Sequence, residues 1–182
     1  MTKPERDHLF DAPAGYDEPL EMLLGCHRRI EKQLDTLKRL PVYLDGHAVD
    51  PEASIAARNV LRYFDNAAAN HHADEELDLF PLLDLRIDDS GERRRFAAFR
   101  ARLEHDHRAV EAAWARLRKP LEGIADGLTR PLPHEDVQAF AAAYADHIRA
   151  EESALGEFFD RWLRADDRRT LGLAMAARRN IA

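Results

Sequence analysis

The sequence predicts an all-α protein: an up-down-up-down four-helix bundle with an N-terminal arm and a short C-terminal helix. Charged residues make up 34% of the 182-residue chain, against about a quarter in an average soluble protein. Apolar residues recur at alternating steps of three and four along four long segments, which is the period of an amphipathic helix. Glycine and proline cluster between these segments, and no segment alternates with the two-residue period of a strand.

The chain divides into an arm over residues 1–16, a bundle over 17–163, and a C-terminal helix and tail over 164–182. The arm is charged and has no apolar stretch of the kind found in secretory signals. The one cysteine, Cys26, excludes an internal disulfide and favours a reducing compartment. A net charge of −7 argues against nucleic acid as a partner, and no apolar run approaches membrane-spanning length. We therefore expect a cytoplasmic protein, and the oligomeric state is left open.

The first helix is expected to begin at an Asp17 N-cap, with Pro19 in its first turn, and to end at Pro41. One histidine, His27, stands in its apolar stripe, whose other members are Leu20, Leu23, Ile30, Leu34 and Leu37. The loop after this helix contains a further histidine, His47.

The second helix is expected to open with Asp50 as N-cap and Pro51 as first residue, and to kink or end at Pro81. Its stripe places His71 and Glu75 at core positions, among Val60, Phe64, Ala67, Ala68, Leu79 and Leu82. The neighbouring His72 and Glu76 lie about 100° further round the helix.

The third helix is expected to follow a capping turn at 88–91 and to end near Pro120. Its stripe contains His107, with Phe96, Phe99, Leu103, Val110, Trp114 and Leu117, while His105 lies off the stripe. The fourth begins at 133–136, and its stripe contains His147 and Glu151 with Val137, Phe140, Tyr144, Leu155, Phe158 and Trp162. A short final helix is expected over about 167–179.

Ionisable side chains thus interrupt the apolar stripe of every long helix near its middle. A single core histidine is more often hydrogen-bonded than metal-bound, and a His-Glu pair four residues apart is often a surface pair. Four interrupted stripes at one depth are different, because each unpaired buried charge costs several kcal/mol. A shared metal centre would satisfy them all. His72 and His105 flank the expected ligands and could hydrogen-bond to them. Tyr144, one turn before His147, could contact a bound oxygen species or simply belong to the core.

Imidazole and carboxylate ligands suit iron, manganese or zinc, and the absence of thiolates argues against a cysteine-rich zinc site. The ferritin-like di-iron pattern requires two Glu-x-x-His motifs. Only Glu104 and His107 match it here, so that pattern is disfavoured.

Four motifs together resemble the hemerythrin-like, HHE cation-binding proteins, over residues 20–159. They are His27-x-x-Ile30, His71-x-x-x-Glu75-Glu76-x-x-Leu79-Phe80-Pro81, Asp106-His107-Arg108-x-Val110 and His147-Ile148-x-x-Glu151-Glu152. The fourth helix has Leu155-Gly156-Glu157 where some members of the family repeat Leu-Phe-Pro.

The resemblance implies a non-haem pair of iron ions with an oxo or hydroxo bridge, in which zinc or manganese could substitute. Its terminal ligands would be His27, His71, His107 and His147, and its bridging carboxylates Glu75 and Glu151. His47 stands where iron-centre-repair members supply one more histidine, and its role is left open. With or without it, one or two of about twelve coordination positions stay free for a small ligand.

The leading hypothesis is a di-iron protein that binds O2 or a related small oxidant such as NO or peroxide. Two alternatives stay open. One is a di-iron redox enzyme or an iron-handling or iron-centre-repair protein, although the cysteine-bearing N-terminal domain of the repair proteins is absent from this sequence. The other is a sensor or interaction module that metal only stabilises.

Overall fold

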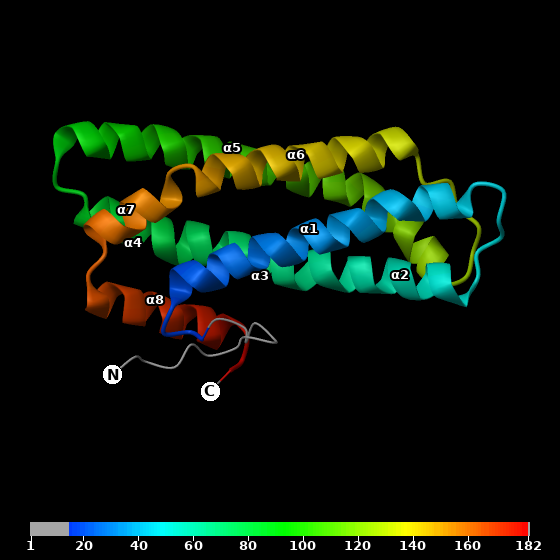
Figure 1. The fold of residues 1–182 in the computed structure, drawn as a ribbon, viewed down its shortest axis with the longest axis horizontal. Coiled ribbons are helices and arrows are strands. Elements are labelled where there is room, and N and C mark those ends of the chain that lie inside the picture. The colour runs from blue at the N-terminus through cyan, green and yellow to red at the C-terminus, as the bar shows by residue number, and fades with distance from the viewer. Residues whose placement is uncertain (1–14, 182) are drawn as a thin grey trace, which may run out of the picture.

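The computed structural model of the protein describes residues 15–181, where all regular secondary structure is helical (Figure 1). Four long rods run side by side. The first is α1 (Pro19–Leu44), and the second is a continuous run of α2 (Pro51–Arg62), η1 (Tyr63–Ala68), α3 (Ala69–Ala73), η2 (Asp74–Leu79) and α4 (Phe80–Arg86). The third is α5 (Ser90–Ala125), and the fourth joins α6 (His134–Glu152) to α7 (Leu155–Trp162), after which α8 (Ala165–Arg178) follows. The predicted arm falls almost wholly on residues 1–14, outside the described range.

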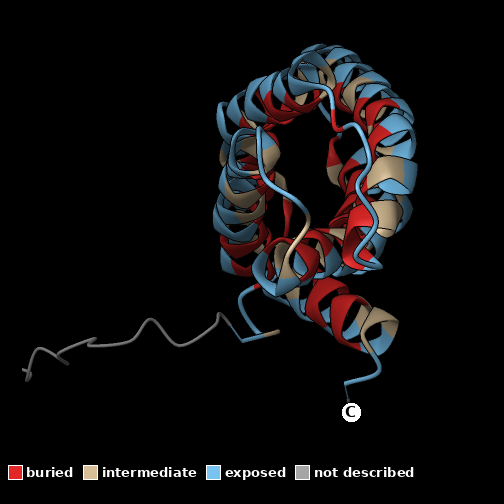
Figure 2. Cartoon of the chain, turned by 90° about the vertical axis from the view of Figure 1, so that its right-hand side faces the viewer, coloured by how far each residue is buried: buried red, intermediate tan, exposed pale blue. Residues whose placement is uncertain are grey.

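The four rods form a ring, and at one end α4 of the second rod also contacts α7 of the fourth. α1 packs against the second rod and α6, and α5 packs against the same two neighbours. Viewed along the bundle, the buried faces point inward and the exposed faces outward (Figure 2). This arrangement confirms the predicted all-α bundle. Between residues 15 and 181, no helix combines the length and the apolar character needed to cross a membrane.

The predicted starts of the second, third and fourth helices are correct, and the N-cap predicted for the first is wrong. The Asp50 carboxylate accepts a hydrogen bond from the Ala53 amide at 2.8 Å, and the Asp89 carboxylate caps α5 in the same way through the Gly91 and Glu92 amides. Asp17 does not cap α1. Glu18 takes the N-cap position, and its side chain makes no capping hydrogen bond.

The prediction that prolines end the first and third helices is also wrong. Pro41 lies inside α1, and Pro120 lies inside α5. A proline removes one helical hydrogen bond and crowds the preceding turn. Continuing α5 beyond Pro120 buries Leu121 and Ile124 completely, and burying two such side chains outweighs the loss of one hydrogen bond.

The fourth rod is broken where a continuous helix was predicted. Helix α6 ends at Glu152, and α7 begins at Leu155. Between them the Ser153 hydroxyl donates to the Ala150 carbonyl at 2.6 Å. The break redirects the chain so that Leu155, Phe158 and Phe159 are buried at one end of the bundle.

The second rod winds more loosely over η1 and η2, where the helix is of the π type. Single π turns inside α-helices are rare and occur frequently at functional sites. A π turn rotates all later residues relative to a regular α-helix. In this rod it allows His71, His72 and Glu75 to be buried together, although a regular helix would turn His72 away from the stripe. The rod then continues past Pro81 to Arg86.

The interior contains two apolar clusters. The larger extends towards the α1–α2 loop and includes Ile30, Val60, Val110, Leu117, Val137 and Phe140. The smaller extends towards α7 and α8 and includes Leu23, Leu79, Leu103, Phe158, Leu171 and Met175. In each rod the buried histidines and glutamates fall near the boundary between the two clusters, so that they form a polar layer across the bundle.

Helix α8 and the residue after it are held to the second rod by ion pairs at Asp74, at Asp78, which pairs with Arg178, and at Arg86. The carboxylate of Asp74, which is fully buried, accepts hydrogen bonds from Arg179 at 2.6 and 3.1 Å and from Arg178 at 2.8 Å. At the other end of α8, Arg86 donates to Asp167 at 2.6 and 2.9 Å. The Asp74 contact lies in η2, one residue before Glu75, and therefore connects the C-terminal helix to the polar layer.

Candidate metal centre

The polar layer contains seven ionisable side chains, each at most 6% exposed. They come from all four rods: His27 from α1, His71 and His72 from α3, Glu75 from η2, His107 from α5, and His147 and Glu151 from α6. The structure thus brings together the six residues for which the sequence predicted a ligand role with little ambiguity, and it adds His72.

Four of these residues form one group. His27, His71, Glu75 and Glu151 each offer a donor atom, and these atoms lie within 4.8 Å of one another. The Nε2 atoms of His27 and His71 are 3.1 Å apart. The Glu151 Oε2 atom lies 3.2 Å from His27 Nε2 and 4.0 Å from His71 Nε2.

The other three histidines form a second group. Donor atoms of His72, His107 and His147 also lie within 4.8 Å of one another. The rings of His72 and His107 stack with their centroids 4.0 Å apart, and the His107 and His147 rings meet edge to face at 4.7 Å.

Both glutamates face the two groups at once. Glu75 directs Oε1 towards His71 Nε2 at 3.7 Å and Oε2 towards His107 Nε2 at 3.1 Å. Glu151 Oε2 lies 3.4 Å from His147 Nε2 in addition to its contacts in the first group. Two carboxylates between two sets of imidazoles are the arrangement expected of residues that bridge a pair of metal ions.

Most of the donor atoms have no other partner. Among the described residues, both oxygens of Glu75, Oε1 of Glu151, Nε2 of His107 and both ring nitrogens of His147 make no hydrogen bond. Buried polar atoms are nearly always satisfied, because leaving them unpaired costs free energy. Nitrogen and oxygen donors without sulfur suit non-haem iron, with manganese or zinc as substitutes. The residues present therefore fit a two-metal centre.

Two glutamates outside the layer orient its rings. Glu152 lies 2.9 Å from His27 Nδ1, and Glu76 lies 2.7 Å from His107 Nδ1. Arg108 in turn donates to Glu76 at 2.7 Å. A carboxylate on Nδ1 fixes the ring with Nε2 directed at the metal and makes that nitrogen a stronger donor. This role was not predicted from the sequence, although each of these glutamates directly follows a predicted bridging glutamate. The repeated Glu-Glu pair was the signal that could have indicated it.

Replacing Glu76 or Glu152 by glutamine is therefore expected to weaken metal binding without abolishing it. The amide keeps the shape but loses the charge that orients and polarises the imidazole, a change that costs roughly 10- to 100-fold in metal affinity. Competition with a chelator of known affinity measures the effect. Glu157→Gln, which removes an exposed partner of Arg95, is the matched control, and an equal loss in that variant would contradict the assigned role.

Burial and mutual contact set the protonation of the layer. Burial, followed by the charge of Glu151, raises the pKa of Glu75 well above its usual range. Burial also opposes ionisation of Glu151, yet its hydrogen bond with His27 lowers its pKa below the usual value. Burial lowers the pKa of His71 to about 3 and that of His147 to about 4. These histidines are therefore neutral near pH 7, as metal ligation requires.

The metal-free protein is expected to lose stability as the pH falls from about 6.5 to about 4. Burial lowers the pKa of His71, His147 and His72 below the ordinary value of 6.5, so the unfolded chain takes up more protons than the folded one in this window. The raised pKa of Glu75 acts in the opposite direction, and so does that of His27, which its contacts with Glu151 and Glu152 raise against the effect of burial. The three imidazoles with lowered pKa values outnumber these two groups. For each proton that the unfolded chain binds in excess of the folded protein, the free energy of unfolding falls by about 1.4 kcal/mol per pH unit.

Urea unfolding of the chelator-treated protein across this pH range measures that dependence. A metal-free protein that is more stable at pH 5 than at pH 7 would show that the histidines are not held neutral by burial. In the metal-loaded protein, the same protons compete directly with the metal for the ligand nitrogens.

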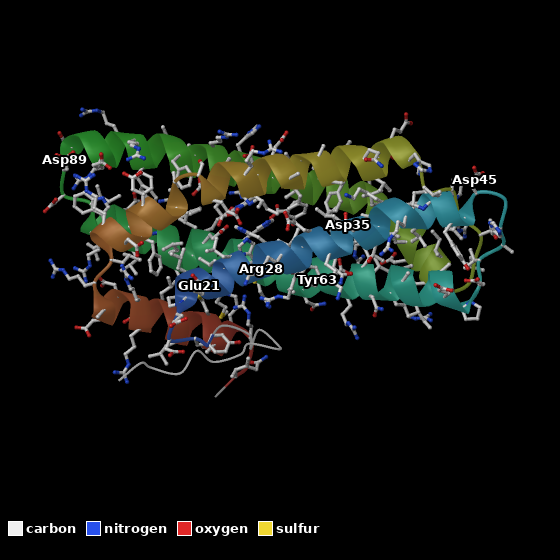
Figure 3. The ribbon with its side chains drawn as sticks, in the orientation of Figure 1. Glu21, Arg28, Asp35, Asp45, Tyr63 and Asp89 are labelled. Carbon is white, nitrogen blue, oxygen red and sulfur yellow. The ribbon has the colours of Figure 1, made fainter. Side chains whose placement is uncertain are left out.

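Two predicted residues do not reach the layer. His47 is exposed in the loop after α1, where it stacks on Tyr43 and contacts the Asp45 carbonyl. Figure 3 labels Asp45 at the far end of the bundle, roughly 25 Å along α1 from His27 at 1.5 Å per residue. His47, whose role was left open, thus lies outside the group of ligand candidates. His105 is exposed on α5, because two residues before His107 is the opposite face of a helix, and it does not support a ligand.

His72 and Tyr144 lie together at the edge of the layer. From its place beside His71, His72 was given only a possible contact with a ligand, and the structure places it among the ligand candidates. The buried Tyr144 hydroxyl lies 3.5 Å from His72 Nε2. Burial raises the pKa of Tyr144 further above its ordinary value, so this hydroxyl keeps its proton.

Comparison with known proteins agrees with this site. Residues 18–159 match the family described as the hemerythrin HHE cation binding domain, and the chain belongs to this family of helical, metal-binding proteins. It is also 31% identical over 175 residues to a protein of Haemophilus influenzae described as "Uncharacterized protein". That alignment covers 92% of this chain and 94% of the relative.

Proposed function

We propose that the protein holds a non-haem pair of iron ions in the polar layer and binds O2 or a related small oxidant there. One observation carries the proposal. Glu75 presents its two oxygens to imidazoles of two different groups, at 3.7 and 3.1 Å. A single ion does not require a carboxylate whose two oxygens face different groups of imidazoles, whereas a pair of ions can share such a carboxylate as a bridge.

The proposed ligands are divided unequally between the two ions. His27 and His71 would hold one ion, and His72, His107 and His147 would hold the other, with Glu75 and Glu151 shared. Seven side chains would leave open positions in two six-coordinate shells. When bound, a pair of ferrous ions supplies electrons that a small oxidant can accept. The protein contributes the fixed imidazoles, the two shared carboxylates and an interior that contains little water.

Metal analysis and optical spectroscopy test the proposal. The protein is loaded with ferrous iron without oxygen, the iron per chain is counted, and the visible spectrum is recorded before and after oxygenation. Two irons per chain and a spectral change that reverses on removal of oxygen are the expected results. Irreversible oxidation with turnover of peroxide or NO would instead favour a redox enzyme, and metal that only raises the melting temperature would favour a sensor or interaction module.

A further inference from the structure

A pocket of about 290 Å³ lies between the second rod, α5 and α6. Its lining includes exposed Ala69 at one side and buried His72 and Tyr144 at the other. The pocket therefore leads from the surface of the bundle to the edge of the polar layer. Because His72 belongs to the second group of ligand candidates, a molecule in this pocket is next to the centre.

The walls of the pocket are mainly aromatic and aliphatic. The Phe64 ring lies 5.0 Å from Trp114 and 5.6 Å from Tyr144 between ring centroids. Trp114 is held in place by a hydrogen bond from its indole nitrogen to Asp65 at 2.9 Å. A rigid apolar passage favours small uncharged molecules, which lose little hydration on leaving water.

The charges around the pocket act against anions. The acidic side chains that line it are Asp65 and Glu111, and no lysine or arginine is among its described lining residues. Asp65 is already paired with Arg118 at 3.1 Å, so the carboxylate of Glu111 determines the sign of the local charge.

We infer that this pocket is the access route to the centre and that it admits small uncharged molecules, such as diatomic gases, in preference to anions. The inference rests on the proposed function and specifies the class of ligand that reaches the site. The exposed Ala69 controls the width of the outer end, and Glu111 provides the charge selection. Neither residue belongs to the layer, so both can be changed without altering a metal ligand.

The first test locates a gas in the protein directly. Crystals of the wild-type, metal-loaded protein are pressurised with xenon, which binds in apolar cavities, and its anomalous signal is mapped. Xenon is expected beside Phe64 and Tyr144 in the wild type, and it should be absent from Ala69→Leu. The matched control is Ala67→Leu, the same enlargement two residues earlier on another side of the rod, where Ala67 lines a different surface pocket. A wild type without xenon in the pocket would overturn the inference.

The second test measures passage into the site. Stopped-flow binding of NO and of azide is followed in the iron-loaded protein. Ala69→Leu is expected to slow NO association roughly tenfold, an added barrier that leaves the equilibrium affinity unchanged, while Ala67→Leu matches the wild type. Glu111→Gln is expected to speed azide association and leave that of NO as it was.

The outcomes separate the two proposals. If NO binds with equal speed in Ala69→Leu and its control, another route serves the centre and the inference is wrong. If azide enters the wild type as fast as NO and Glu111→Gln changes nothing, the charge selection is wrong. If the loaded protein binds no NO at all, the proposed function fails and the access route with it, even where xenon occupies the pocket.

Discussion

A Glu151→Gln protein is expected to bind neither metal ion at concentrations that saturate the wild type. Glu151 Oε2 lies 3.2 Å from His27 Nε2 and 3.4 Å from His147 Nε2, so one oxygen atom serves both groups of imidazoles. Glutamine keeps the volume of the side chain but removes the charge, and a neutral amide cannot bridge two cations as a carboxylate does. The loss should exceed the roughly 10- to 100-fold that follows from changing an orienting partner.

Metal per chain, measured after equilibration and desalting, tests this expectation. Glu152→Gln is the matched control, because it is the same substitution one residue later and leaves both bridging carboxylates in place. At saturating metal this control should still bind two ions. Circular dichroism confirms that both variants are folded. Full loading of Glu151→Gln with unchanged affinity would exclude Glu151 as a bridging ligand.

Removing both arginines that hold Asp74 is expected to cause the largest loss of stability. In an Arg178→Met, Arg179→Met protein, the Asp74 carboxylate remains fully buried but loses the three hydrogen bonds that the guanidinium groups donate. Leaving a buried charge without its partner costs about 3–5 kcal/mol. Because Asp74 directly precedes Glu75, the same change should also loosen the metal-binding segment.

Urea denaturation of the double variant measures this loss. Arg149→Met is the control, because it breaks an ion pair with Asp146 whose two side chains are 74% and 69% exposed, and such pairs contribute at most about 1 kcal/mol. Adding Asp74→Asn to the double variant should recover part of the stability by removing the unpaired charge. A double variant as stable as the Arg149→Met protein would mean that Asp74 reaches solvent or another cation.

Apolar periodicity predicted the bundle and most of the site because both depend on which face of a helix is buried. The helical period of three and four residues calls for apolar residues at the positions of His27, His107 and His147. This period can be read from the sequence of each helix alone. His72 could not be assigned in this way, since its burial depends on the π turns of the second rod, and a π turn leaves no periodic signature in the sequence.

Periodicity also does not predict which side chains of different rods contact one another. Glu76 and Glu152 were visible as the second members of repeated Glu-Glu pairs, but their hydrogen bonds to His107 and His27 depend on how neighbouring helices are oriented. The family resemblance suggested His47, in the loop after the first helix, as a further ligand and left its role open. The length of α1 beyond His27 places that loop at the far end of the bundle.

The polar layer joins parts of the chain that are made at very different times. His27 and Glu151 are in contact although 124 residues separate them. A chain growing on the ribosome therefore lacks a complete donor set until its fourth rod has emerged, and metal can be inserted only after that point. Ions bound at the proposed centre would cross-link the first and last rods, closing a loop of most of the chain's length and opposing its opening.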